Sequence, residues 1–558
     1  MNPDVDAFGS RRSTVYAPEG IVATSQPLAA EAGVGTMRQG GNAFDAAVAT
    51  AAALNVVEPT STGLGGDVFA LYRTAEGEVG AMRACGGAPA NATIENVREA
   101  VAEGRGAPDQ PDVSDPADAT MPEFGPHAVT VPGTARGWEA TVEELGELEF
   151  AETLQPAIRY AIDGYPVTEV VSAQWQHGED RFTDDNAREA YLFDGEAPGV
   201  GQEVTLPKLG RSLETIAAEG ADAVYEGAIG EEIAAEVQSQ GGFLTTDDLT
   251  DFSVEWPEPV STEYRGAEIY ELPPNNQGLL ALEALNLASE VDAGDHPYDS
   301  AERVHAFAEA MKLAFVDGHH YVTDPAFEDV PDLASTAYAA ERASEIGELA
   351  IEDAEIGFPK DAGPGGDGAT GHDPAEDADT ALLCAADAEG NVVSFINSRF
   401  HGFGSGLVAG DTGIALQNRG ASFSLAPDHP NRLEPGKRPF HTLIPAVAKL
   451  DQDDWAAFGV MGGYMQPQGH VQVLSNVLDY GMPLQAALDA PRWRYREDGS
   501  LAVEERMHEG VATKLVRKGH SVEILPPALF GGAQIVRNEG GTLSGATEPR
   551  KDGQVAGF

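Results

Sequence analysis

Residues 361–398, DAGPGGDGATGHDPAEDADTALLCAADAEGNVVSFINS, join an acidic segment to an apolar hairpin. The first part, 361–379, is rich in Gly, Asp and Pro and has no large apolar side chain, so it predicts a flexible linker. Thr380 then opens an apolar strand through Ala386, residues 387–391 form a turn, and Val392 to Ser398 returns. The linker therefore ends directly before a threonine at the start of a buried strand.

A threonine in this position has a possible chemical use. A cut between Asp379 and Thr380 would create an α-amino group with a reference pKa of about 7.7–8.0. Such a group is partly neutral near neutral pH and can take the proton of the Thr380 hydroxyl, which makes the oxygen a nucleophile. An Asp-Thr pair is common, however, and taken alone it also fits an ordinary start of a strand.

A second feature is a Gly-Gly step after another predicted hairpin. Residues 447–450 and 455–461 are strand-like around an Asp-rich turn, and Gly462-Gly463 separates them from a helix that extends to about residue 480. Backbone N–H groups at such a step are free to bind an anion near the positive end of the helix dipole. The alternative is an ordinary tight turn between a strand and a helix.

The charge of the chain excludes some partners. There are 91 acidic and 34 basic residues, a formal net charge of −57, while 42% of the residues are hydrophobic. A globular protein with so acidic a surface is not expected to bind nucleic acid or an anionic membrane. Only 8 of the basic residues are lysines. This composition is typical of proteins from salt-adapted organisms, in which salt screens the self-repulsion.

The location and the cysteines are also constrained. Arg11-Arg12 is followed by Pro18-Glu19-Gly20 where a signal peptide needs apolar residues, and no run of eighteen apolar residues occurs. We therefore expect a cytoplasmic protein.

Cys85 and Cys384 have no metal-binding spacing and are expected to be reduced core residues.

Strand and helix signals alternate in the first region of the chain. Residues 21–25 and the hairpin 69–83 are β-prone, an Ala-rich helix follows Asn42 through about Val57, and 90–127 reads as a polar surface excursion. The motifs of α/β-hydrolases, P-loop proteins and zinc proteases are absent. His319-His320, near Asp317, could bind a metal, but a structural role at a helix end is the favoured interpretation.

Taken together, several stretches resemble the γ-glutamyltranspeptidase family, over nearly the whole chain and in the same order. These are residues 20–85, Val131 to Thr134, PPNNQG at 273–278, AEAMKLAFVDGHHYVTDP at 308–325, the Asp379-Thr380 pair, 390–420, PGKRPFHTLIP at 435–445 and Gly462-Gly463.

The resemblance implies an N-terminal-nucleophile hydrolase of the α+β class, a four-layer αββα sandwich that needs no cofactor or metal. One precursor would cut itself into a large chain 1–379 and a small chain 380–558, which form one intertwined domain. This heterodimer could dimerise further. Thr380 matches the nucleophile, Ser398 a hydroxyl that orients it, and Gly462 and Gly463 the oxyanion hole.

Departures from the family pattern concern the substrate. His441 and Thr442 stand where the family has paired serines at the side of the substrate carboxylate. Phe400 replaces an expected Asn, Ser422 an expected acidic residue for the substrate ammonium, and Arg419 a Gln or Glu. An ammonium without a carboxylate partner is poorly held in a shielded site.

The arginine that glutamyl-binding members carry before an Ala-Pro pair is also missing. Cys85-Gly86-Gly87 precedes Ala88-Pro89, and Arg83 is displaced by two residues. The pattern is closer to the branch of oxamate amidohydrolase and cephalosporin acylase. Arg419 could bind a substrate carboxylate there, or form a structural salt bridge.

The resemblance implies a self-processing enzyme that cleaves γ-glutamyl or related amide bonds of small molecules through a Thr380 acyl-enzyme. This is the glutathione hydrolase and γ-glutamyltransferase type. One alternative is an oxamate or cephalosporin-type acyl amide hydrolase without glutamyl specificity. Another is an unprocessed, inactive homologue that acts as a binding protein. The acidic composition resembles that of haloarchaeal proteins.

Overall fold

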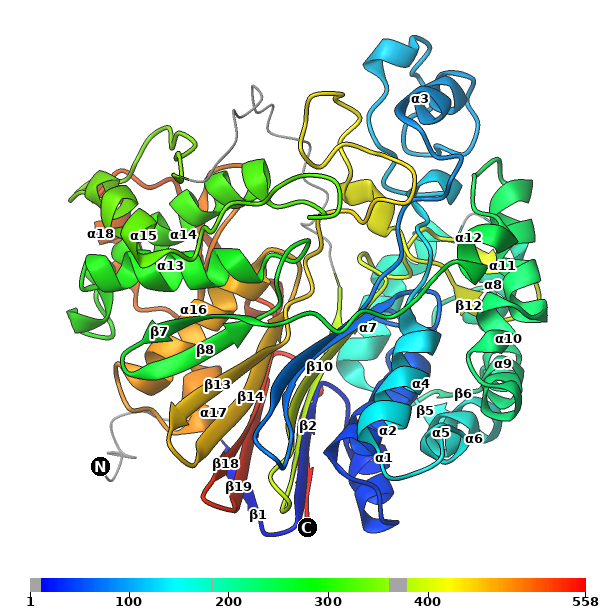
Figure 1. Ribbon diagram of the computed structural model, residues 1–558, viewed down its shortest axis with the longest axis horizontal. Coiled ribbons are helices and arrows are strands. Elements are labelled where there is room, and N and C mark those ends of the chain that lie inside the picture. Colours follow the sequence, from blue (N-terminus) through cyan, green and yellow to red (C-terminus); the bar gives the residue numbers. More distant parts are fainter. Residues whose placement is uncertain (1–11, 183, 361–378) are drawn as a thin grey trace.

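Two β-sheets lie face to face in the computed structural model, with helices on both outer faces (Figure 1). The structure describes residues 12–182, 184–360 and 379–558. The four layers confirm the expected αββα sandwich and the α+β class. The predicted linker lies outside the described residues except for Asp379. Among the described residues, no helix is both long and apolar enough to cross a membrane.

The first sheet contains the hairpin that follows the linker. Its six strands, in spatial order, are β20 (Gln554–Gly557), β2 (Gly20–Thr24), β9 (Ala381–Asp387), β10 (Val392–Ser398), β3 (Asp67–Arg73) and β4 (Val79–Ala84). Both predicted hairpins of this sheet are therefore confirmed. β9 and β10 are antiparallel and pair Ala381 with Asn397, so Thr380 lies beside Ser398 at one end of the sheet.

The second sheet has seven strands and packs on the first. They are β1 (Val15–Ala17), β19 (Thr542–Thr547), β18 (Gly532–Glu539), β14 (Asp454–Met461), β13 (Ala446–Asp451), β8 (Ala267–Glu271) and β7 (Val260–Tyr264). Alternate side chains of β9 divide between two cores. Leu382 and Cys384 pack against the second sheet, whereas Leu383 packs beneath the helices. This alternation follows from the two-residue period of a strand.

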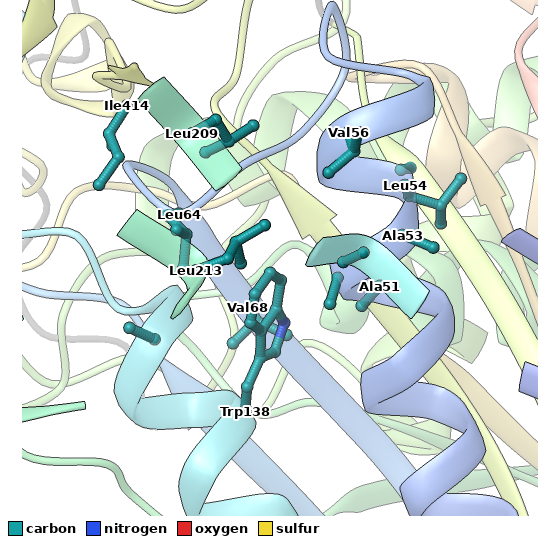
Figure 2. Close-up of a cluster of buried hydrophobic side chains, with 14 of the residues drawn as sticks. Ala51, Ala53, Leu54, Val56, Leu64, Val68, Trp138, Leu209, Leu213 and Ile414 are labelled. Carbon is teal, nitrogen blue, oxygen red and sulfur yellow. The ribbon is translucent and has the colours of Figure 1, made fainter. Parts of the chain in front are cut away.

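The outer face of the first sheet is covered by α1 (Pro27–Arg38), α2 (Ala43–Val57), α4 (Thr134–Leu145), α6 (Gln155–Asp163) and α9 (Pro207–Glu219). Asn42 caps α2 and Asp45 completes a capping box, as the Gly-Gly-Asn start predicts. The small side chains of α2 leave room for Trp138 and Leu213, which pack into the same core (Figure 2).

The second sheet is covered by α13 (Gly278–Glu290), α14 (Ala301–Tyr321) and α16 (Met465–Leu478). The remaining helices are α3 (Ile94–Ala102), α5 (Phe150–Thr153), α7 (Glu169–Gly178), α8 (Asp185–Tyr191), α10 (Asp222–Tyr225), α11 (Ala228–Ser239), α12 (Thr246–Thr250), α15 (Thr336–Arg342), α17 (Leu484–Asp489) and α18 (Glu509–Arg517). Short strands outside the two sheets are β5 (Tyr165–Pro166), β6 (Glu203–Val204), β11 (Val408–Ala409), β12 (Ile414–Ala415), β15 (Trp493–Tyr495), β16 (Leu501–Glu504) and β17 (Val522–Leu525).

The polar excursion at 90–127 is more ordered than its composition indicates. It contains α3, whose Val97 and Val101 are buried with Phe423 and Leu433 in a small separate core. The excursion is thereby packed against the segment that follows Arg419 in the chain.

Gly66 has no room for a side chain, because a Cβ there would lie 2.4 Å from the carbonyl oxygen of Ser398. We expect Gly66→Ala to lower the free energy of unfolding by about 1–3 kcal/mol, the usual cost of overpacking. Gly35→Ala in α1 is the control, since nothing lies within 4 Å of its added Cβ. It should stabilise the chain by about 0.5–1 kcal/mol. Urea unfolding measures both changes, and equal destabilisation by the two would contradict this account.

Candidate active site

Thr380, Ser398 and the Asp379 carbonyl group meet at one end of the first sheet. The Thr380 hydroxyl donates to Ser398 Oγ at 3.3 Å, and Ser398 Oγ donates to the Asp379 carbonyl oxygen at 2.9 Å. The Phe400 N–H donates to the same Ser398 oxygen at 2.8 Å. The two predicted hydroxyl residues are thus directly linked to each other and to the peptide bond at the expected cleavage position. Thr380 is only 1% exposed.

Phe400 fixes the chain on both sides of this arrangement. Its carbonyl oxygen accepts from the Asp379 N–H at 2.8 Å, while its own N–H contacts Ser398. It has a φ of 80°, a left-handed conformation that is strained for a side chain of this size. Such strain costs about 1–3 kcal/mol and persists only where surrounding contacts enforce it.

Gly462 and Gly463 follow β14 and lead into α16, as the strand-to-helix interpretation predicts. Their φ values, 111° and 55°, lie in the region that favours glycine. Among the described residues, neither N–H group has a hydrogen-bond partner. This step is therefore able to donate two backbone hydrogen bonds to an anion.

The two glycines lie at the same end of the sandwich as Thr380. Ser394 Oγ donates to the Phe458 carbonyl at 2.8 Å, and one residue further along β14 a Cβ on Gly459 would lie 3.0 Å from the Leu382 side chain. As β14 runs toward its carboxyl end, it therefore passes along β9 toward Thr380. Gly462 comes directly after that carboxyl end.

Gln277 connects the second glycine to the predicted substrate residues. Its Nε2 donates to the Thr442 carbonyl at 2.6 Å and to the Gly463 carbonyl at 3.0 Å. The Thr442 hydroxyl in turn accepts from Arg419 Nη1 at 2.9 Å. The resemblance implies no role for Gln277, although the PPNNQG motif contains it. Its position after two other amide side chains, Asn275 and Asn276, is the signal that points to it.

Arg419 is fully buried and only partly satisfied. Its guanidinium lies over the Phe400 ring, 4.3 Å from the centroid. Nε and Nη2 have no hydrogen-bond partner among the described residues. Burial lowers the pKa of Arg419 to about 10, although the negative charge of Asp67 opposes this shift. Two free N–H groups on a buried guanidinium are a site for a carboxylate or a similar anion.

Asp67 is the acidic group near Arg419, and other residues already occupy it. It contacts His441 Nε2 at 3.1 Å and accepts from Gln417 and from the Gly133 N–H. Burial raises the pKa of Asp67 to about 7, against the effect of Arg419. Burial, with Arg419 nearby, also holds the pKa of His441 well below its usual value, so His441 is neutral. His441 thus supports Asp67 instead of presenting a charge.

The other predicted substrate residues are less central. Ser422 is half-buried in the turn that starts at Arg419, and its carbonyl accepts from Asn431 Nδ2 at 2.6 Å. Arg83 is occupied elsewhere, since its Nη2 donates to the Pro273 and Pro274 carbonyls. It therefore does not take the place of the missing arginine.

A pocket around the Asp379 side chain was not predicted. Asp379 Oδ2 accepts from Ser61 and from Gln174 at 2.9 Å each, and Lys551 Nζ lies 3.4 Å from Oδ1. Ser61 Oγ also lies 2.9 Å from Oε1 of Glu58, the C-cap residue of α2. These residues, which we call the Asp379 pocket (Glu58, Ser61, Gln174 and Lys551), come from three distant parts of the chain.

The metal alternative gains no support at His319 and His320. His319 packs against Phe440 and Tyr464. Within residues 12–182, 184–360 and 379–558, the one group with suitably close ligand atoms is His305, Glu309 and His520. Its carboxylate already accepts from Lys312 and from a backbone N–H.

Comparisons with known proteins find relatives over nearly the whole chain. The family model described as gamma-glutamyltranspeptidase matches residues 29–558. The glutathione hydrolase-like YwrD proenzyme of Bacillus subtilis is 37% identical over 98% of this chain and 99% of its own length. The oxamate amidohydrolase proenzyme of Klebsiella pneumoniae is 34% identical over 98% of this chain and 100% of its own.

A solved structure extends the likeness to the fold. The cephalosporin acylase of Bacillus halodurans superposes with a TM-score of 0.88 and 43% identity, covering 100% of this chain and 99% of its own. The matches span both outer helical layers and both sheets. The chain is therefore an enzyme of the γ-glutamyltranspeptidase family.

Proposed function

We propose that the chain cuts itself between Asp379 and Thr380 and then hydrolyses small amides through an acyl-enzyme on Thr380. The observation that carries the proposal is the contact series from Thr380 Oγ1 through Ser398 Oγ to the Asp379 carbonyl oxygen. In this series the Thr380 hydroxyl contacts Ser398, and Ser398 donates a hydrogen bond to the carbonyl oxygen of the bond that we propose is cut. The proenzyme names of the relatives support the same two-chain product.

Cleavage has to precede catalysis, because Thr380 is buried in the uncut chain. The cut frees the Thr380 α-amino group, which then takes the hydroxyl proton as Oγ1 adds to a substrate carbonyl. The negative oxygen that forms needs two donors, and the free N–H groups of Gly462 and Gly463 supply them. The amine leaves, water attacks the ester, and Thr380 is regenerated.

The substrates we propose are amides whose acyl part carries a free carboxylate. The unpaired Nε and Nη2 of Arg419 are suited to bind that carboxylate. A γ-glutamyl group has such a carboxylate but also an ammonium, and the acidic group beside Arg419, Asp67, is already engaged. We therefore propose that carboxylate amides without an ammonium, of the oxamate or glutaryl type, are preferred over γ-glutamyl amides.

Purified protein in multimolar salt tests this proposal. Denaturing electrophoresis should show two fragments, the smaller starting at Thr380. Oxamate, a glutaryl amide and a γ-glutamyl anilide are then compared by kcat/KM. A higher value for the glutamyl compound would contradict the proposed specificity. A single uncut chain that binds these compounds without hydrolysing them would instead support a binding protein.

A further inference from the structure

The Asp379 pocket contains two carboxyl groups that share one hydroxyl. Ser61 Oγ lies 2.9 Å from Glu58 Oε1 and 2.9 Å from Asp379 Oδ2. Glu58 also accepts from Ser25 Oγ at 2.5 Å. Glu58, Ser61 and Ser25 are at most 1% exposed, so bulk water does not replace these contacts.

A serine hydroxyl has one proton and cannot donate to two carboxylates at once. Both contacts are hydrogen bonds when one carboxyl group is itself protonated and donates to Ser61. Asp379 has two further donors as partners, the cation Lys551 and the Gln174 amide. Among the described residues, the hydrogen-bond partners of Glu58 are the hydroxyl groups of Ser25 and Ser61. Burial raises the pKa of Glu58 to about 7, although the charge of Lys551 opposes this shift. The proton therefore belongs on Glu58.

Asp379 also reaches the atom that has to be protonated. Its Oδ1 accepts from the Thr380 N–H at 3.0 Å. Thr380 N is the leaving nitrogen of the proposed cleavage, and an amide nitrogen cannot leave without a proton. A continuous path thus connects Glu58 through Ser61 and Asp379 to that nitrogen.

We propose that Glu58, Ser61 and Asp379 form a proton relay that protonates the Thr380 nitrogen while the chain cuts itself. The inference rests on the proposed self-cleavage and adds to it a path to the nitrogen of the bond, whereas Ser398 contacts the carbonyl oxygen of that bond. Asp379 touches the reacting nitrogen, whereas Glu58 acts through Ser61 and is a positioning residue.

Cleavage begins when Thr380 Oγ1 bonds to the Asp379 carbonyl carbon. The proton of the Thr380 hydroxyl passes to Ser398 Oγ, and the proton of the Ser398 hydroxyl passes to the carbonyl oxygen. The C–N bond then breaks and its electron pair goes to the Thr380 nitrogen. Ser61 passes its proton to Asp379 Oδ2 and takes the proton of Glu58 in its place. Rotation of the Asp379 carboxyl group then brings its proton to the Thr380 nitrogen, which Oδ1 contacts before the reaction. The proton on the former carbonyl oxygen leaves to solvent as the ester C=O forms, and Glu58 regains a proton from solvent. Water then hydrolyses this ester, which gives Asp379 a terminal carboxyl group, restores the Thr380 hydroxyl and separates the two chains.

The relay makes cleavage depend on pH. The charged groups that face Glu58 are Lys551 and Asp379. Because the protonated form of Glu58 is the donor, the cleavage rate should be constant in acid and fall about tenfold per pH unit above about 7. Thr380 has no α-amino group before cleavage, so this fall cannot come from a terminal amine.

Glu58→Gln tests the relay because glutamine keeps the shape and a donor but has no acidic proton. The full chain is refolded from denaturant into multimolar salt, and cleavage is followed by electrophoresis at a series of pH values. We expect cleavage about 10²-fold slower in acid, with no fall above neutrality. Glu309→Gln, at another fully buried glutamate on α14, is the matched control and should keep the wild-type rate and profile.

Variants of Ser61 provide a second, independent test of the relay. Ser61→Ala breaks the relay and should slow cleavage as Glu58→Gln does, whereas Ser61→Thr keeps the hydroxyl and should restore most of the rate. The urea midpoint of each variant shows whether it folds. A Glu58→Gln chain that is cut at the wild-type rate, or slowly but with the wild-type pH profile, would overturn the relay while leaving the proposed function intact. A wild-type chain that is never cut at Thr380 would overturn both.

Discussion

The Thr380→Ala variant is expected to remain one chain and to hydrolyse no amide. The hydroxyl that it removes is the group beside the Asp379 carbonyl, and it lies within hydrogen-bond distance of Ser398. Loss of the nucleophile in other acyl-transfer enzymes costs about 10⁶ in kcat. Here the loss acts twice, because an uncut chain also keeps residue 380 buried. Electrophoresis and the mass of the small chain measure the first effect, and amide hydrolysis measures the second.

Two further variants make this result specific. Thr380→Ser keeps a hydroxyl and should be cut, although more slowly, since it lacks the methyl group that restricts the side-chain rotamer. Thr323→Ala removes an equally buried hydroxyl that donates to the Pro430 carbonyl, and it should be cut like the wild type. Normal cleavage of the Thr380→Ala chain would remove Thr380 from the mechanism.

The parts of the fold that could be predicted depend on local patterns. The hairpin of β9 and β10 follows from two apolar runs around the polar turn at residues 387–391, and α2 follows from its Asn42 cap and alanines. The Gly462-Gly463 turn is predictable for the same reason, because these two residues separate a strand pattern from a helix pattern. Each of these signals lies within about twenty residues of sequence.

The parts that could not be predicted depend on contacts between distant segments. Lys551 and Asp379 are 172 residues apart in sequence, and Ser61 and Asp379 are 318 apart. Glu58 looks like an ordinary helix end until the fold encloses it with a second carboxylate. The same holds for Arg419. Its Nε and Nη2 are unpaired because the packing of distant segments places no acceptor beside them among the described residues.

Arg419→Gln is expected to lower kcat/KM for carboxylate-bearing amides by about 10²–10⁴. Two charge-assisted hydrogen bonds, at about 1.5–3 kcal/mol each, account for this range. Glutamine is shorter than arginine and offers no cationic pair of N–H groups. Arg419→Lys keeps the positive charge but lacks the planar guanidinium, so its kcat/KM should lie between that of the wild type and that of Arg419→Gln. The measurement is kcat/KM for a carboxylate amide beside a neutral amide of the same size.

The neutral amide shows whether Arg419→Gln removes recognition of the substrate carboxylate or disrupts the structure of the site. If Arg419 binds the substrate carboxylate, the neutral amide keeps its rate in Arg419→Gln, and the preference between the two substrates collapses. If Arg419 instead only balances the buried charge of Asp67, its removal leaves that carboxylate unpaired, and the free energy of unfolding falls by about 3–5 kcal/mol. Both amides would then lose activity in proportion to the fraction of folded chain. Self-cleavage gives a third measure, because the contacts of Asp379, Thr380 and Ser398 do not include the guanidinium. A variant that is cut normally but no longer distinguishes the two amides can be explained only by a role of Arg419 in recognising the carboxylate.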